Sequence, residues 1–217
     1  MYITWLGQSA FKFQDKLGAD GFTVTTDPFN PDKTGLKMPS FEADIVTISH
    51  DHDDHNYLKA LRKDPFVIDT AGEFEYKGVY IEGIDSYHDD EKGAKRGSNV
   101  IFRFDFSDLS VAHLGDLGHI LTDKQIERLE GVDVLIVPIG GVYTIDAKKA
   151  VEVINQLEPR VVIPMHYQID GLELPEQLDN LEKFIKELGI APEYEEKLKI
   201  SKKDLPTDAT KLVILTV

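Results

Sequence analysis

Three histidines and three aspartates stand within six consecutive residues, His50-Asp51-His52-Asp53-Asp54-His55. The run directly follows residues 44–49 (DIVTIS), an apolar and β-branched segment that predicts a buried strand. Strand ends at the carboxyl edge of a sheet are where α/β proteins place their sites. Imidazole and carboxylate groups bind divalent metals, and a sharp turn lets imidazoles two residues apart converge on one point. The run therefore predicts a metal site; the alternative is a solvated acidic turn with incidental histidines.

The hydrophobic pattern alternates strands with turns in the first half of the chain and strands with helices in the second half. It predicts an α/β fold, with one domain spanning residues 1–217 because no linker-like stretch divides the chain. Loops are expected at residues 28–41 and 88–98, the second of them mobile. Strands are expected at residues 2–6, 10–13, 22–26, 44–49, 66–69, 79–87, 100–106, 109–114, 132–139, 160–165 and 211–217, and helices at 56–63, 123–130, 147–157 and 175–188.

Composition excludes several classes of function. The chain has no Cys, so disulfides, thiol catalysis and Cys-ligated metals are excluded. Its formal net charge is −15, which disfavours binding to a nucleic-acid phosphate backbone. No apolar run approaches the roughly 18 residues of a membrane span, and the first residues read as a strand, not a signal peptide. We therefore expect a cytoplasmic protein that binds neither membrane nor nucleic acid; association with further copies of itself stays open.

More ligands are needed than the His-rich run supplies, because a zinc ion takes about four and two ions take more. His88, Asp116 and His166 are the candidates, since each stands at or just past the end of a predicted strand. The carboxyl ends of such strands can share one rim with the His-rich turn. His55 is expected to open the helix at 56–63, where the helix dipole would favour its neutral, metal-binding form.

The motifs resemble those of the metallo-β-lactamase fold hydrolases, which implies a four-layer αββα sandwich and hydrolase activity. The resemblance rests on Thr26-Asp27-Pro28, the SHDHDDH run, His88, the HLGD run that ends at Asp116, and the IPMHY run that contains His166. A narrower resemblance is to a branch of small metal-dependent hydrolases akin to L-ascorbate-6-phosphate lactonase. It rests on Trp5-Leu6-Gly7, Pro138-Ile139-Gly140-Gly141 and Pro164-Met165-His166-Tyr167.

Carried over residue by residue, the resemblance implies two divalent ions, zinc or alternatively manganese. The first ion would be held by His50, His52 and His88, the second by Asp54, His55 and His166, and Asp116 would bridge them. Asp27 would support the His-rich loop by accepting an imidazole N–H. One residue departs from the pattern: many relatives of the lactonase carry His after Trp-x-Gly, where this chain has Gln8, which can hydrogen-bond but cannot shuttle protons.

Other residues are candidates for contact with substrate or for proton transfer, each with a plain structural alternative. Lys92, Lys95 and Arg96 could clamp an anion or form a solvated loop. Tyr143 and Tyr167 could stabilise an oxyanion or pack in the core. His119 could act as acid or base or lie in a surface turn. His113 could support the metal ligands or be a satisfied core histidine.

The leading hypothesis is metal-assisted hydrolysis, in which a bridging hydroxide held by two ions attacks an ester-type bond and Asp54 orients it. The net positive charge of such a site would attract a small anionic substrate. A lactone or other cyclic ester is favoured by the resemblance, and a small phosphodiester is the alternative. Two further classes stay open: a di-iron oxidoreductase, and a non-catalytic module that binds metal or ligand.

Overall fold

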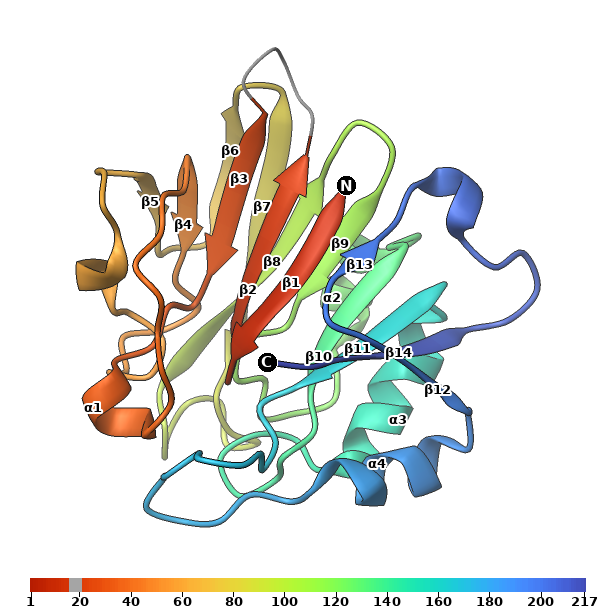
Figure 1. The fold of residues 1–217 in the computed structure, drawn as a ribbon. Helices are drawn as coiled ribbons and strands as arrows, with labels where there is room; N and C mark the ends of the chain where they lie inside the picture. The colour runs from red at the N-terminus through yellow and green to blue at the C-terminus, as the bar shows by residue number, and fades with distance from the viewer. Residues whose placement is uncertain (16–20) are drawn as a thin grey trace.

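Two β-sheets lie face to face in the computed structural model, which describes residues 1–15 and 21–217 (Figure 1). The first sheet has the order β13-β1-β2-β3-β4-β5, and the second has the order β12-β14-β11-β10-β9-β8-β7-β6. The strands of the first sheet are β1 (Tyr2–Gly7), β2 (Ala10–Asp15), β3 (Phe22–Thr26), β4 (Ile45–Thr47), β5 (Phe66–Ile68) and β13 (Leu198–Lys199). Those of the second are β6 (Gly72–Tyr76), β7 (Val79–Tyr87), β8 (Ser98–Asp105), β9 (Ser110–His113), β10 (Val134–Pro138), β11 (Val161–Met165), β12 (Pro192–Glu195) and β14 (Lys211–Leu215).

Aromatic side chains join the two sheets. The ring centroid of Phe13 on β2 lies 5.4 Å from that of Phe104 on β8, in an edge-to-face arrangement. On the same strand, Phe11 lies 5.9 Å, centroid to centroid, from the His113 ring on β9. These side chains are part of one hydrophobic cluster that takes buried residues from both sheets. Because alternate residues of a strand face opposite sides of a sheet, the first sheet contributes to this core the side chains on the face turned toward the second sheet.

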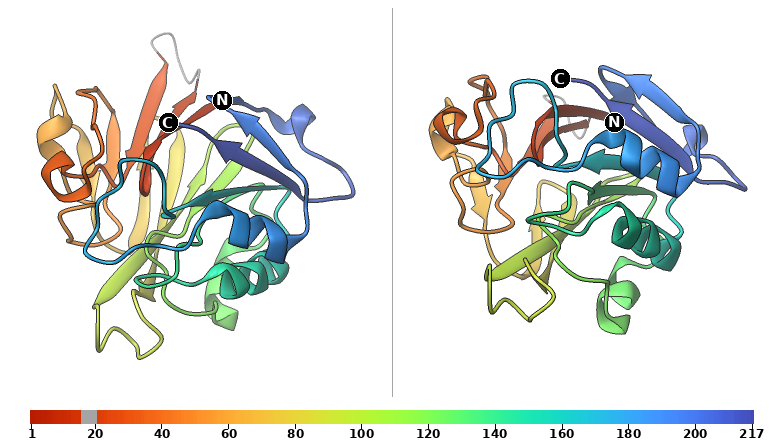
Figure 2. Two further views of the ribbon diagram at one scale, coloured as in Figure 1. Left: turned by 60° about the horizontal axis from the view of Figure 1, so that its bottom comes forward. Right: turned by 90° about the horizontal axis from the view of Figure 1, so that it is seen from below.

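The helices cover the two sheets unequally. They are α1 (Pro31–Thr34), α2 (Asp123–Leu129), α3 (Ala147–Leu157) and α4 (Leu181–Leu188), with short 3-10 turns η1 (Leu58–Ala60) and η2 (Lys202–Asp204). Helix α3 packs on β10 with α2 and α4 beside it, so these three cover the outer face of the second sheet (Figure 2). Beside the first sheet lie the short α1 and η1 (Figure 1). The predicted α/β sandwich is confirmed, with outer layers of unequal size.

Two predicted helices differ from the structure because tertiary hydrogen bonds compete with helix formation. Residues 56–63 form only η1, since the amide of Tyr57 donates to the carbonyl of Pro28 and the amide of Arg62 donates to the carbonyl of Phe41. His55 therefore lies in a turn and does not open a helix. The helix predicted at 175–188 begins only at Leu181, because the Asn180 side chain accepts a bond from the amide of Lys183 and caps it.

Other differences are additions. Pro31 begins the four-residue helix α1 inside the expected loop at 28–41. The strands β6, β12 and β13 are short or exposed edge strands that the hydrophobic pattern does not mark. None of the helices in the described part of the chain has the length and apolar character that a bilayer-spanning helix needs.

The carboxyl ends of strands from both sheets meet at one edge of the sandwich. Strands β1, β3 and β4 run in one direction, as their antiparallel and parallel pairings require. The same holds for β7, β9, β10 and β11 of the second sheet. The loops after β3 and β11 lie at the bottom of Figure 1 and in front in the right panel of Figure 2. This edge carries Gln8, Asp27 and the His-rich run from the first sheet, and His88, Asp116 and His166 from the second.

Candidate metal centre

The carboxylate of Asp116 is surrounded by imidazoles. Its Oδ2 lies 3.2 Å from the Nε2 atoms of His88 and His166, 3.3 Å from Nε2 of His55 and 3.9 Å from Nε2 of His50. Asp116 and these four histidines are buried. One carboxylate oxygen therefore occupies the centre of the candidate ligand set, the position that a shared ligand would take.

Three overlapping groups of side chains place their ligand atoms within 4.8 Å of one another. The groups are His50, His52 and His88; His50, His55 and Asp116; and Asp54, His55 and His166. The structure therefore brings together all seven residues that the sequence analysis names as metal ligands. Of these, His52 is the exposed member and lies at the entrance.

Asp27 fixes the orientation of two of these imidazoles. Its Oδ2 accepts hydrogen bonds from Ser49 Oγ at 2.7 Å and from His55 Nδ1 at 3.0 Å. Because the Ser49 hydroxyl donates to Asp27, it accepts from His50 Nδ1, 3.0 Å away. Both imidazoles therefore keep a proton on Nδ1 and turn Nε2 toward Asp116. This network is the support that the sequence analysis predicts for Asp27, extended by Ser49.

The buried nitrogens fit a cation. Within the described part of the chain, Nε2 of His50 and Nε2 of His55 are buried without a hydrogen-bond partner. An unpartnered buried nitrogen is costly, and a metal ion is the partner that a neutral imidazole accepts there. Five imidazoles with two carboxylates suit Zn²⁺, and the carboxylates also suit Mn²⁺. The residues present therefore fit divalent metal.

The pKa shifts of the buried histidines and of Asp116 also favour a site that binds cations. Burial, followed by the charge of His55, lowers the pKa of His50 to about 3, against the opposing effect of Asp116. Burial alone would lower the pKa of His55, but the charges of Asp116 and Asp54 raise it well above its ordinary value. Burial would raise the pKa of Asp116, yet His166, His55 and His88 hold it well below the usual range. The centre thus keeps its carboxylates ionised and is built to hold positive charge.

Polar residues between the two sheets hold Asp116 in place. Its backbone amide donates to Asn99 Oδ1 at 2.9 Å, and Ser9 Oγ donates to its Oδ1 at 3.5 Å. His113 donates from Nε2 to the Ser9 carbonyl at 2.9 Å and accepts at Nδ1 from the Gly115 amide. Both ring nitrogens of His113 are therefore engaged, which makes it a buried support for Ser9. Asn99, Ser9 and Ser49 are small polar residues without a spacing signal, and sequence reasoning missed them.

Gln8 contacts the same centre from the turn between β1 and β2. Its Nε2 donates to Asp54 Oδ2 at 3.1 Å, and its backbone carbonyl accepts the amide of His166 at 3.2 Å. Gln8, Asp27 and His166 have φ of 51°, 40° and 51°, a left-handed conformation uncommon outside Gly. Such strain is typical of functional sites whose surroundings enforce it. Gln8 thereby supports two members of the Asp54, His55 and His166 group.

We expect Gln8→Met to weaken one group of ligands selectively. The variant loses the hydrogen bond to Asp54, and removal of such a support lowers metal affinity by about 10- to 100-fold. Titration of metal-free protein with Zn²⁺ should show the weaker binding event shifted and the tighter one unchanged. Gln14→Met is the control, because the Gln14 side chain accepts a bond from the exposed Lys197 and contacts none of the candidate ligands among the described residues. Equal Zn²⁺ affinities in Gln8→Met and the original chain would contradict this role.

A cavity of about 480 Å³ opens onto the ligands. Its wall includes His52, Asp54, His88, Asp116 and His166, and at the entrance Lys33, Lys95, Arg96, Tyr143, Leu174 and Pro175. Tyr143 thus lies where the sequence analysis expects it. Tyr167 follows the other alternative, packing in the core: it is buried and stacks on Trp5 with ring centroids 5.2 Å apart, and burial raises its pKa.

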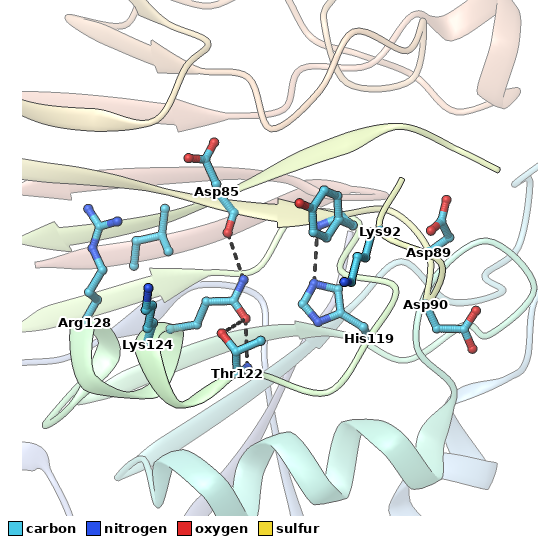
Figure 3. A pocket seen from close by; sticks show the side chains of 11 residues that line it. Asp85, Asp89, Asp90, Lys92, His119, Thr122, Lys124 and Arg128 are labelled. Atoms are coloured by element: carbon cyan, nitrogen blue, oxygen red, sulfur yellow. Dashed lines mark hydrogen bonds between the residues drawn. The ribbon is translucent and has the colours of Figure 1, made fainter. Parts of the chain in front are cut away.

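Two predicted participants lie in a different pocket. His119 and Lys92 line a hollow between the end of β7 and α2 (Figure 3), and none of the candidate metal ligands lines it. His119 Nδ1 donates to the carbonyl of Ile120 at 2.8 Å, and Nε2 accepts the amide of Tyr87 at 3.3 Å. With both nitrogens bonded to backbone, His119 has no free position for proton transfer in this structure. His119 is a candidate in the sequence analysis because it follows Asp116 by three residues. Sequence distance does not show in which direction the intervening turn points a side chain.

Comparisons with known proteins agree with this centre. Residues 2–166 match a family model described as the β-lactamase superfamily domain. A UPF0173 metal-dependent hydrolase of Thermoplasma acidophilum is 26% identical over 91% of this chain and 98% of its own. A counterpart from Staphylothermus marinus is 31% identical over 76% of this chain and 82% of its own. A crystal structure from Thermotoga maritima, assigned as a Zn-dependent hydrolase of the metallo-β-lactamase superfamily, has a TM-score of 0.78 at 34% identity, covering 99% of this chain and 98% of that one.

Proposed function

The chain belongs to the β-lactamase superfamily domain family and is a metal-dependent hydrolase, and on this basis we propose that it uses two divalent ions to cleave an ester-type bond in a small anionic molecule. The observation that carries the proposal is the position of Asp116 Oδ2 between the imidazoles of both sheets. A single carboxylate shared by two overlapping ligand groups is what a pair of ions requires. The second group adds Asp54, so each ion would have three side-chain ligands besides Asp116.

The ligand chemistry supports zinc, with manganese as the alternative. Imidazole nitrogens outnumber carboxylates in the centre, and zinc takes both kinds of ligand. Divalent ions in such a site act as Lewis acids and lower the pKa of bound water toward about 7. Two divalent ions outweigh the charges of Asp54 and Asp116, so the site attracts anions despite the acidic chain.

The side chains around the centre have distinct tasks. Asp27 and Ser49 hold the imidazoles of His50 and His55 in the metal-binding orientation. Gln8 restrains Asp54 by donating a hydrogen bond to its Oδ2. The cavity volume of about 480 Å³ is large enough for a small molecule such as an ester or lactone.

The test combines metal content with a substrate panel. We expect about two equivalents of Zn per chain, measured by elemental mass spectrometry on protein purified without affinity metals or chelator. We expect hydrolysis of anionic lactones and esters to exceed that of bis(4-nitrophenyl) phosphate, to stop after chelation and to return when Zn²⁺ is restored. Faster turnover of the phosphodiester would assign the alternative bond. No more than one equivalent, even after reconstitution, would contradict the paired ions.

A further inference from the structure

We propose that Arg96 alone receives the anionic group of the substrate, and that this group is a carboxylate or phosphate joined to the scissile ester through a short apolar segment. This inference rests on the proposed ester hydrolysis and specifies its substrate class. It replaces the three-cation clamp of Lys92, Lys95 and Arg96 with a single residue.

A turn built around one carboxylate holds Arg96 in place. Asp89 is buried, and each of its oxygens accepts two backbone amides at 2.8 Å, from Glu91 and Gly93 on Oδ1 and from Lys95 and Arg96 on Oδ2. Four backbone hydrogen bonds to one carboxylate thus define a turn within the loop predicted at residues 88–98.

The same turn is tied to the metal centre. The amide of His88, a candidate ligand, donates to the Gly97 carbonyl at 3.1 Å, and the amide of Gly97 donates to Gly93 at 3.0 Å. Gly118 packs so closely against the backbone of His88 and Asp89 that a Cβ atom there would collide with it. The backbone on both sides of Arg96 is thus held at a fixed place relative to His88.

The other cations near the cavity are occupied or turned away. Lys95 pairs with Glu91, and Lys33 pairs with Asp53 at 3.3 Å. Lys92 lies in the separate pocket beside His119, as Figure 3 shows. No carboxylate of the described residues lies within ion-pair distance of the Arg96 guanidinium, which lines the cavity. Arg96 is therefore the cation whose charge is available to a ligand.

An aromatic ring orients the guanidinium. It lies 5.4 Å from the ring centroid of Tyr143, whose hydroxyl accepts the amide of Glu176 at 3.0 Å. A guanidinium stacked on a ring keeps its planar edge free for two parallel hydrogen bonds to an oxyanion. Leu174 and Pro175 add apolar surface to the same cavity. A guanidinium beside apolar surface favours a ligand in which an oxyanion is attached to an apolar segment.

Matched hydroxamates test the inference by binding to the zinc-loaded protein. Succinic monohydroxamic acid carries a carboxylate, and butyrohydroxamic acid has a methyl group in its place; glutaric and adipic homologues extend the series. We expect the tightest-binding acid of the series to bind about 10- to 100-fold more tightly than the hydroxamate with a methyl group in place of its carboxylate. One charged, hydrogen-bonded contact provides a difference of this size. Arg96→Met should abolish this preference, Arg96→Lys should keep part of it, and Lys92→Met should leave it unchanged. A preference that survives Arg96→Met, or that Lys92→Met removes, would overturn the assignment.

A second measurement is independent of the metal. In chelator-treated protein, the Arg96 Nε–H resonance, assigned by its absence in Arg96→Met, should shift saturably with phenylacetate and not with phenylacetamide. Benzylphosphonate tests whether a phosphoryl group replaces the carboxylate. No shift with either anion refutes the role of Arg96. A shift without hydroxamate binding would keep the role of Arg96 and would contradict the metal-centred function.

Discussion

Replacing Asp116 by Asn is expected to abolish turnover while the fold persists. Asp116 Oδ2 lies within 3.2–3.9 Å of four imidazole nitrogens, and an amide in its place removes the charge that both ligand groups share. Lewis-acid catalysis contributes several kcal/mol to barrier lowering, so kcat/KM should fall by about 10³-fold or more. The measurements are kcat/KM on the preferred ester, Zn content per chain, and thermal unfolding as a check of the fold.

Asp51→Asn is the matched control for this change. Asp51 stands in the same acidic run, but it is exposed, and its carboxylate accepts a bond from the Asn56 side chain at 2.6 Å. The same loss of one charge there should leave kcat/KM and Zn content unchanged. If Asp116→Asn kept the original rate, Asp116 could not be a ligand shared by two ions. If both variants lost activity, total charge and not the position of Asp116 would be responsible.

The candidate metal ligands are predictable from sequence because their signals are local or lie at strand ends. The run His50–His55 follows a short buried strand, and the carboxyl ends of parallel strands meet at one edge of a sheet. His88, Asp116 and His166 each follow a strand that the hydrophobic pattern marks. Spacing and periodicity thus predict which side chains converge, although the helix expected after His55 does not form.

The supporting residues are not predictable in the same way, because their partners lie far along the chain. Gln8 meets Asp54 across 46 positions, and Ser9 meets Asp116 across 107. Neither contact follows a period of strand or helix. The turn at 88–98 looks polar and mobile in sequence, since its order comes from a single carboxylate, Asp89, that bonds four amides.

The direction of a side chain is the other limit of sequence reasoning. Lys92, Lys95 and Arg96 are close in sequence, yet Lys92 lines a separate pocket while Arg96 lines the metal cavity. Lys92 has a φ of 58°, a left-handed conformation that changes the course of the turn. His119 and Tyr167 likewise stand near a candidate ligand in sequence, but His119 bonds backbone groups in the separate pocket and Tyr167 packs on Trp5 in the core.

Asp27→Asn is expected to lower metal affinity by changing the tautomer of one imidazole. Asn tolerates the φ of 40° at this position, and its carbonyl can still accept the Ser49 amide, which now bonds Oδ1 at 2.7 Å. The new amide nitrogen would then face Ser49 Oγ and His55 Nδ1, where Oδ2 now accepts both. His55 Nδ1 must therefore become an acceptor, and the remaining ring proton lies on Nε2, the atom that faces Asp116.

A protonated Nε2 cannot bind a metal ion, so Zn²⁺ affinity should fall by about 10- to 100-fold, with a matching loss of activity. The ¹⁵N chemical shifts of the His55 ring report the tautomer directly and separate this cause from simple unfolding. Asp44→Asn is the control, because Asp44 bonds the Thr23 amide and Lys77 at the surface and touches no imidazole. Unchanged ring shifts together with unchanged Zn²⁺ affinity in Asp27→Asn would show that Asp27 does not set the metal-binding form of His55.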